Sequence, residues 1–197
     1  MKNKIGYKFI QNNMMSKNGS HTWQVGKWYT EKEMEICRKG FHACKQPLES
    51  LEYIYGDKWF IVEYKGKIIE EGDKFCAETM KLIKKIPIDK VLKRFAIYCA
   101  KQCLVNYEKV YPEDKRPFEA IQAAEDYLDN KINLKELNNK LSAAWSAESA
   151  AESAAVSAWS AAWSAESAAW SAARSAARSA ARSAQNKELL RLIKEHT

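Results

Sequence analysis

The chain has 197 residues, and its 32 basic and 25 acidic side chains give a formal net charge of +7. This excess favours anionic partners such as nucleotides or acidic proteins. The number of cysteines is odd and no apolar segment follows the first four residues, which argues against an exported protein held by disulfides. The longest uncharged helical stretch, 153–165, is shorter than the roughly 20 residues that cross a bilayer. We therefore expect a cytoplasmic protein without a membrane span.

Residues 1–87 are predicted to form a small mixed α/β domain, because they combine glycines with short alternating segments. Residues 59–64 and then 68–69 are expected to be strands, with Gly66 and Gly72 in tight turns. The apolar spacing of residues 47–54 predicts a helix instead.

Residues 88–197 are predicted to form a second, helical domain, because no glycine follows residue 87 and the only prolines are Pro112 and Pro117. Apolar residues recur at helical spacing over 88–111. Pro112 should end this helix, since proline disfavours helix in the residue before it. Pro117 suits the first turn of the next helix.

A third helix is predicted to begin near Asn133, which can cap it together with Glu136. Over 142–184, serines recur about every 3.7 residues among alanines, close to the 3.6 residues of an α-helical turn. Alanine is the best helix former and nothing interrupts the run. The predicted fold class is therefore α+β, a small mixed α/β domain followed by an all-α region that ends in one long Ala/Ser-rich helix over about 134–195.

The residues that precede the serines form one row along this helix, which we predict to be a binding or assembly surface. The row contains Glu166 and the candidate contact residues Trp145, Glu148, Glu152, Val156, Trp159, Trp163, Trp170, Arg174, Arg178 and Arg182. Indoles supply large apolar area, so they could also be core residues packed on the helices of 89–130. Base stacking beside the arginines is a further alternative, although nucleic acid is not the expected partner.

The acidic residues of this row come early and the arginines late, which predicts a homo-oligomer. In an antiparallel pair centred on Trp163, Glu148 would meet Arg178 and Glu152 would meet Arg174. A two-fold contact requires opposite charges at equal distances from the axis, and these pairs satisfy that condition.

Two thiols and an imidazole, Cys37, His42 and Cys44, lie close together in the sequence. Zinc could bind them if Cys76 or His21 supplied a fourth ligand, but the spacing matches no common zinc pattern. A cysteine nucleophile would need an orienting third group, and no signature for one is present. We favour packed cysteines in a buried strand, without metal, cofactor or catalysis, and an enzyme acting through these three residues remains an alternative.

The sequence contains neither a P-loop nor a Gly-x-Gly-x-x-Gly motif, so no known type of phosphate-cradling loop is available. A ligand site in the basic N-terminal domain is still possible. Its candidate residues are Lys27, Trp28 and His42.

Three motifs in the helical region, 98–102 (YCAKQ), 111–117 (YPEDKRP) and 120–124 (AIQAA), precede the alanine-rich tail. Together they resemble immunity proteins related to the Imm5 family, over residues 92–185. In the N-terminal region, 25–29 (VGKWY) and 40–44 (GFHAC) are similar to an uncharacterised domain of phage and prophage proteins. That domain's strand-then-helix layout resembles ADP-ribosyltransferase-like folds, but their catalytic motifs are not evident.

These resemblances imply a phage or mobile-element protein that acts in the cytoplasm of a bacterial host. The leading hypothesis is a non-enzymatic binding protein that neutralises a toxin, an antiphage defence effector or an immune signal. One alternative is an oligomeric sponge that sequesters an anionic nucleotide immune signal, and another is a structural helical oligomer.

Overall fold

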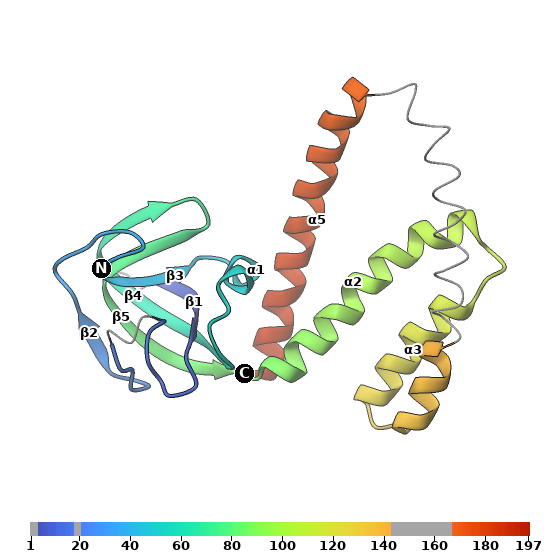
Figure 1. Cartoon of the computed structure of the whole chain (residues 1–197), viewed down its shortest axis with the longest axis horizontal. Helices are drawn as coiled ribbons and strands as arrows, with labels where there is room; N and C mark the ends of the chain where they lie inside the picture. The colour runs from blue at the N-terminus through green and yellow to red at the C-terminus, as the bar shows by residue number, and fades with distance from the viewer. Residues whose placement is uncertain (1–3, 18–20, 143–166) are drawn as a thin grey trace. The chain divides into compact units, whose positions relative to one another are not determined.

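The computed structural model describes residues 4–17, 21–142 and 167–197, shown in Figure 1. The chain divides into two compact units. Unit 1 contains Met1–Leu92 together with Gln185–Thr197, and unit 2 contains Lys93–Ala184. The fold class is α+β, as expected, because a sheet precedes the helices.

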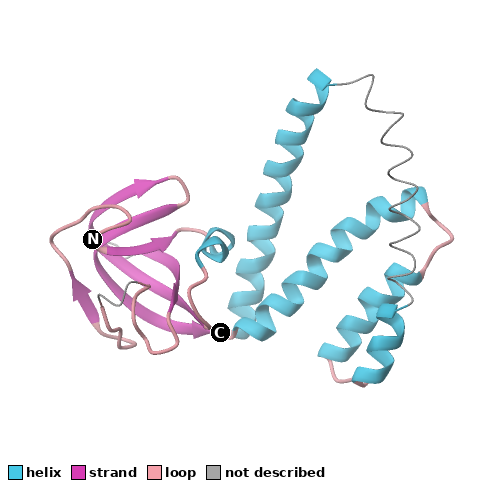
Figure 2. Cartoon of the chain, viewed as in Figure 1, coloured by secondary structure: helices cyan, strands magenta, loops and turns pink. Residues whose placement is uncertain are grey.

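Unit 1 is built on an antiparallel sheet that closes on itself (Figure 2). Its strands are β1 (Lys4–Ile10), β2 (Trp28–Thr30), β3 (Phe41–Cys44), β4 (Lys58–Glu71) and β5 (Lys74–Ile86). The strand order is β2-β5-β3-β1-β4, and β4 also pairs with β5. Strands β5, β3, β1 and β4 therefore form a small closed ring. Strand β2 pairs with the part of β5 that continues beyond its pairing with β3.

The interior of this ring is a core of aromatic and aliphatic side chains, each at most 7% exposed. Its members are Ile10, Trp23, Phe41, Ala43, Phe60, Val62, Tyr64, Phe75, Ala77, Met80 and Leu82. On β1, Gly6 is needed for closure, because a Cβ there would lie 2.9 Å from the carbonyl oxygen of Cys44 on β3. A side chain at this position would push the two strands apart.

The turn predicted at Gly66 is wrong. Strand β4 continues through it, and the register with β5 shifts between Lys65 and Ile68. Gly66 has φ +82 and forms a bulge, which accommodates a left-handed residue inside a strand without ending it. The turn predicted at Gly72 is confirmed, because this residue (φ +60) connects β4 to β5.

The helix predicted at residues 47–54 is confirmed as α1 (Pro47–Ser50) followed by a 3-10 turn, η1 (Leu51–Tyr53). It is held by Trp59 of β4, which is completely buried. The Trp59 indole donates a hydrogen bond to Ser50 Oγ (3.0 Å) and stacks on Phe9 with ring centroids 5.3 Å apart.

The end of helix α5 (Ser167–His196) also belongs to unit 1. Leu189, Leu192 and Ile193 are at most 2% exposed, and the backbone N–H of Leu48 in α1 donates to Asn186 Oδ1 (3.1 Å). These C-terminal residues were predicted to belong to the helical domain. Their apolar side chains instead complete the packing of unit 1.

Unit 2 contains most of α2 (Ile88–Val110), all of α3 (Arg116–Leu128) and a further helical stretch at 134–142. The predicted turn between α2 and α3 is confirmed, with Pro117 in the first turn of α3. Asp114 organises it by accepting hydrogen bonds from Tyr107 Oη (2.8 Å) and from the Arg116 guanidinium (2.8 and 2.9 Å). These hydrogen bonds hold the pKa of Asp114 well below its usual range.

The predicted cap at Asn133 is also confirmed. Its side-chain oxygen accepts from the backbone N–H of Glu136 (3.0 Å), and the Glu136 carboxylate accepts from the backbone N–H of Asn133 (2.9 Å). The continuous helix predicted over about 134–195 is described only at its two ends, because residues 143–166 lie outside the described residues. Among the described helices, none is long and apolar enough to span a membrane.

Replacing Leu189 by alanine should lower the free energy of unfolding by about 2–4 kcal/mol, because it leaves a cavity among completely buried side chains. The adjacent Leu190→Ala is the matched control. Leu190 is only partly buried, so its loss should cost less. Urea unfolding followed by circular dichroism measures both, and equal costs would contradict the docking of α5 on unit 1.

Candidate ligand-binding site

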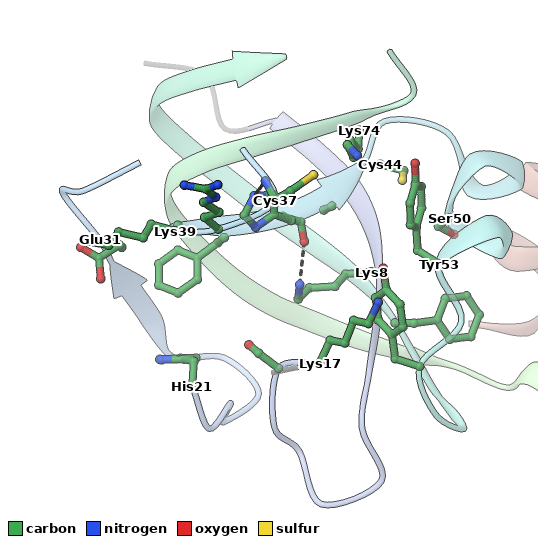
Figure 3. Close-up of a pocket in the computed structure, with 18 of the residues that line it drawn as sticks. Lys8, Lys17, His21, Glu31, Cys37, Lys39, Cys44, Ser50, Tyr53 and Lys74 are labelled. Carbon is green, nitrogen blue, oxygen red and sulfur yellow. Dashed lines mark hydrogen bonds between the residues drawn. The ribbon is translucent and has the colours of Figure 1, made fainter. Parts of the chain in front are cut away.

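Unit 1 contains a cavity with a volume of about 750 Å³, shown in Figure 3. Its walls come from β1, β2, β3, the first residue of β5, the loops that follow β1 and β2, and the α1–η1 segment with the loop after it. Ligand sites typically have volumes of about 300–1,000 Å³. The basic lining residues are Lys8, Lys17, Arg38, Lys39 and Lys74, and the acidic ones are Glu31, Glu33 and Glu52.

Lys8 is the central cation of the cavity. Alternation along β1 places it on the same strand face as Ile10, a member of the core. Its ammonium donates to the carbonyl oxygen of His42 (2.6 Å) and lies 5.6 Å from the Trp23 ring centroid. Among the described residues, no carboxylate contacts it. Burial lowers the pKa of Lys8 to about 8, and the Cys44 and Cys76 thiols oppose that shift.

His21 lies in an aromatic cluster on the cavity wall. Its ring meets those of Trp23, Tyr29 and Phe41 edge-on, with centroids 4.7, 4.3 and 5.2 Å away. Burial lowers its pKa, and the nearby Lys8 adds to the effect. His21 is therefore neutral at pH 7. Its Nε2 atom is buried and has no hydrogen-bond partner among the described residues.

The Cys37, His42 and Cys44 cluster does not form a thiol–imidazole pair. His42 Nε2 accepts a hydrogen bond from the backbone N–H of Cys37 (2.8 Å), so this nitrogen is occupied by backbone and not by a thiol. Burial lowers the pKa of His42 and raises that of Cys44 to about 12. A buried thiol with such a pKa is a poor nucleophile.

All five cysteines are free. Cys44 and Cys76 are buried, which agrees with the prediction of packed cysteines, whereas Cys37 is exposed with φ +65 in the turn before β3. Cys76 Sγ donates to the carbonyl oxygen of Lys39 (3.1 Å). In the part of the chain that the structure describes, no group of three His, Cys, Asp or Glu side chains is placed to hold a metal ion.

The rim of the cavity carries two further lysines that face aromatic rings. Lys17 lies 4.5 Å from the Tyr55 ring centroid, and Lys74 lies 5.6 Å from that of Tyr53. Two other cations, Lys39 and Arg38, are paired with Glu33 and Glu35. Lys8, Lys17 and Lys74 thus form no ion pair among the described side chains, and a hydrogen bond to the Cys37 side chain together with the nearby Glu71 charge raises the pKa of Lys74.

Only one of the three predicted ligand-site residues lines the cavity, namely His42. Trp28 lies outside it, with the ammonium groups of Lys65 and Lys81 4.3 and 4.6 Å from its ring centroid. Lys27 is also outside and lies 5.3 Å from the Tyr29 ring centroid. Lys8 was not predicted as a site residue. The available signal was a lysine on the same face of the strand as Gly6 and Ile10.

The predicted binding row falls largely outside the described side chains. Residues 145–163 of the row lie outside the described residues, and Trp170, Arg174 and Arg178 are placed only as backbone within α5. Arg182 is exposed. The assembly role of this row stays a prediction.

The Lys8→Met variant tests whether Lys8 is a desolvated cation. Its pKa is lowered from 10.5 to about 8 in the folded state, so the unfolded state binds the proton more tightly and Lys8 becomes less destabilising as pH rises. The free energy of unfolding of Lys8→Met minus that of wild type should therefore fall by on the order of 2 kcal/mol between pH 7 and pH 10. Urea unfolding at both pH values measures this difference.

The matched control is Lys84→Met, which removes an exposed lysine from β5 outside the cavity. Its difference from wild type should not change over this pH range. If the Lys8→Met difference is equally constant, Lys8 is solvated and not desolvated.

Comparison with known proteins identifies both parts of the chain. Residues 88–173 match the model of a family described as Imm-5 like putative immunity protein. Residues 4–94 match the model of a domain of unknown function, DUF7666. No curated protein and no solved structure matches the chain. An N-terminal match to DUF7666 is thus followed by a match to the Imm-5 like family, which confirms the two-part resemblance expected from the sequence.

Proposed function

We propose that this protein is a non-enzymatic neutraliser that binds a protein toxin or an antiphage defence effector through its helical unit. The match of residues 88–173 to an immunity protein family carries the proposal. Immunity by binding requires a stable surface and a partner, and it needs no catalytic group in the binding protein. The occupied His42 Nε2 and the high pKa of the Cys44 thiol support binding over cysteine chemistry.

The helical unit exposes large apolar side chains suited to a protein contact. Val105 and Val110 on α2 are 54% and 66% exposed, and Phe118 on α3 is 46% exposed. Apolar anchors of this kind dominate the energy of many protein interfaces. The turn between α2 and α3 is held by the Asp114 hydrogen bonds, so part of this surface is preorganised.

Titration distinguishes a binder from an enzyme. Host cells that express one toxin or defence effector at a time would first identify the neutralised protein. The activity of this purified toxin or effector should fall in proportion to the amount of the immunity-like protein added. Inhibition should be complete near equimolar amounts. Full inhibition at a small fraction of an equivalent would show turnover and contradict the proposal.

Surface variants assign the contact to unit 2. Val110→Asp and Phe118→Asp replace exposed residues, so both variants should fold, yet each should weaken neutralisation by about tenfold or more because a charge would be buried in the contact. Val25→Asp is the matched control, since Val25 is 53% exposed in unit 1. Protection that survives both unit 2 changes but fails with Val25→Asp would place the contact on unit 1.

We also propose that the Ala/Ser-rich segment continues as one helix through residues 143–166 and pairs with an antiparallel copy about Trp163. Sequence periodicity and the mirrored charges support this arrangement. Light scattering should give a mass of at least two chains at tens of micromolar, and Trp163→Glu should reduce it. A single-chain mass for the wild type would contradict the pairing.

Two other functions fit an oligomer, a sponge for a nucleotide signal and a purely structural assembly. A protein that oligomerises but inhibits no toxin or effector would favour one of these. Binding of a small anion by the oligomer then separates the sponge from the structural role.

A further inference from the structure

We propose that the cavity of unit 1 is a nucleotide-binding site in which Lys8 is the central contact for the phosphate group. This inference is independent of whether the helical unit neutralises a protein. It rests on the cations, aromatic rings and unpartnered polar atom that β1, β3 and the neighbouring loops bring together (Figure 3).

The first step is the unbalanced charge of Lys8. Buried or partly buried charges in proteins are normally paired, because desolvation without a partner is costly. An ammonium group has three N–H donors, and among the described residues Lys8 donates only to the His42 carbonyl oxygen. The group therefore retains donors and charge for an anion that enters the cavity.

The second step is the arrangement of the other cations. Lys17 follows β1 and Lys74 begins β5, and each lies over a tyrosine ring without contacting a carboxylate among the described side chains. Of the three acidic lining residues, Glu33 is paired with Lys39, and Glu31 accepts a hydrogen bond from the backbone N–H of Glu33 (3.0 Å). The third, Glu52, adds negative charge near Cys44 on the α1–η1 side of the cavity. The three lysines suit a phosphate group, which carries more than one negative charge at neutral pH.

The third step is the planar surface beside these cations. Tyr29, Phe41, Tyr53 and Tyr55 line the cavity, and aromatic rings stack on nucleobases whatever the base. The unpartnered Nε2 of His21 offers a hydrogen bond to a base or ribose. A bare inorganic anion would use neither feature, and a volume of about 750 Å³ exceeds what it needs.

The protonation states agree with this assignment. His21 and His42 are neutral at pH 7, because burial lowers both pKa values, so Lys8 supplies the charge in this part of the cavity. The ionisable groups that face Lys8 are Cys44 and His42 on β3, Cys76 on β5 and His21 in the loop after β1. Both thiols are held protonated by burial. Affinity should fall above about pH 8, where free Lys8 loses its proton.

Calorimetric titration of the full chain at pH 7 tests the site with AMP, GMP, CMP, UMP and ADP. At least one of them should bind, and adenosine or the matching nucleoside and inorganic phosphate should each bind at least about tenfold more weakly. Absence of binding by all five nucleotides at millimolar concentration would overturn the proposal. Nucleoside affinity equal to that of the nucleotide would overturn the role of the lysines, and equal phosphate affinity would overturn the role of the rings.

Lys8→Met should weaken nucleotide binding by about tenfold or more, because it removes a charge-assisted contact. Lys17→Met should have a smaller effect in the same direction, and Lys84→Met, outside the cavity, should have none. Wild-type affinity in folded Lys8→Met would overturn the assignment. If Lys8→Met does not fold by circular dichroism, Lys17→Met decides, because Lys17 is exposed; unchanged affinity there contradicts the proposal.

Discussion

The structure of unit 1 depends on β5, which pairs with strands on both of its edges. One edge runs along β4, and the other pairs first with β3 and then with β2. This double pairing closes the ring, and the closure in turn brings β1 within reach of β3. Gly6 allows that approach, and Lys8, two residues further along β1, consequently meets the backbone of His42. The cavity and its central cation are therefore products of closure and not of any local motif.

Local signals in the sequence predicted much of the fold. The α2–α3 turn and the Asn133 cap were predictable because proline and capping residues act within a few residues of their own position. Gly66 was misinterpreted because a glycine with positive φ marks a turn and a bulge equally well, and the partner strand decides between them. The burial of Leu189 could not be predicted locally, because the surface that covers it is far away in the sequence.

The candidate site was predicted less well than the fold, for the same reason. His42 was identified because it stands beside two cysteines in the sequence, but its ring nitrogen is bound to backbone and not to a thiol. Lys8 had no chemical neighbour in the sequence, and its partners come from other strands and loops. By residue type alone, Trp28 and Lys27 were as plausible as Lys8 for a ligand site. Strand direction placed them beside Lys65, Lys81 and Tyr29, outside the cavity.

The segment α1–η1 connects the cavity wall to the end of the chain. Ser50 and Tyr53 line the cavity, and Ser50 Oγ also accepts the indole hydrogen bond of the buried Trp59. On the same segment, the backbone of Leu48 is bound by Asn186 of α5. Removing residues 185–197 would therefore remove contacts that hold the α1–η1 segment, which forms one wall of the cavity. The proposed ligand binding by unit 1 would for this reason require the full chain, because an N-terminal fragment that ends before unit 2 lacks part of its own core.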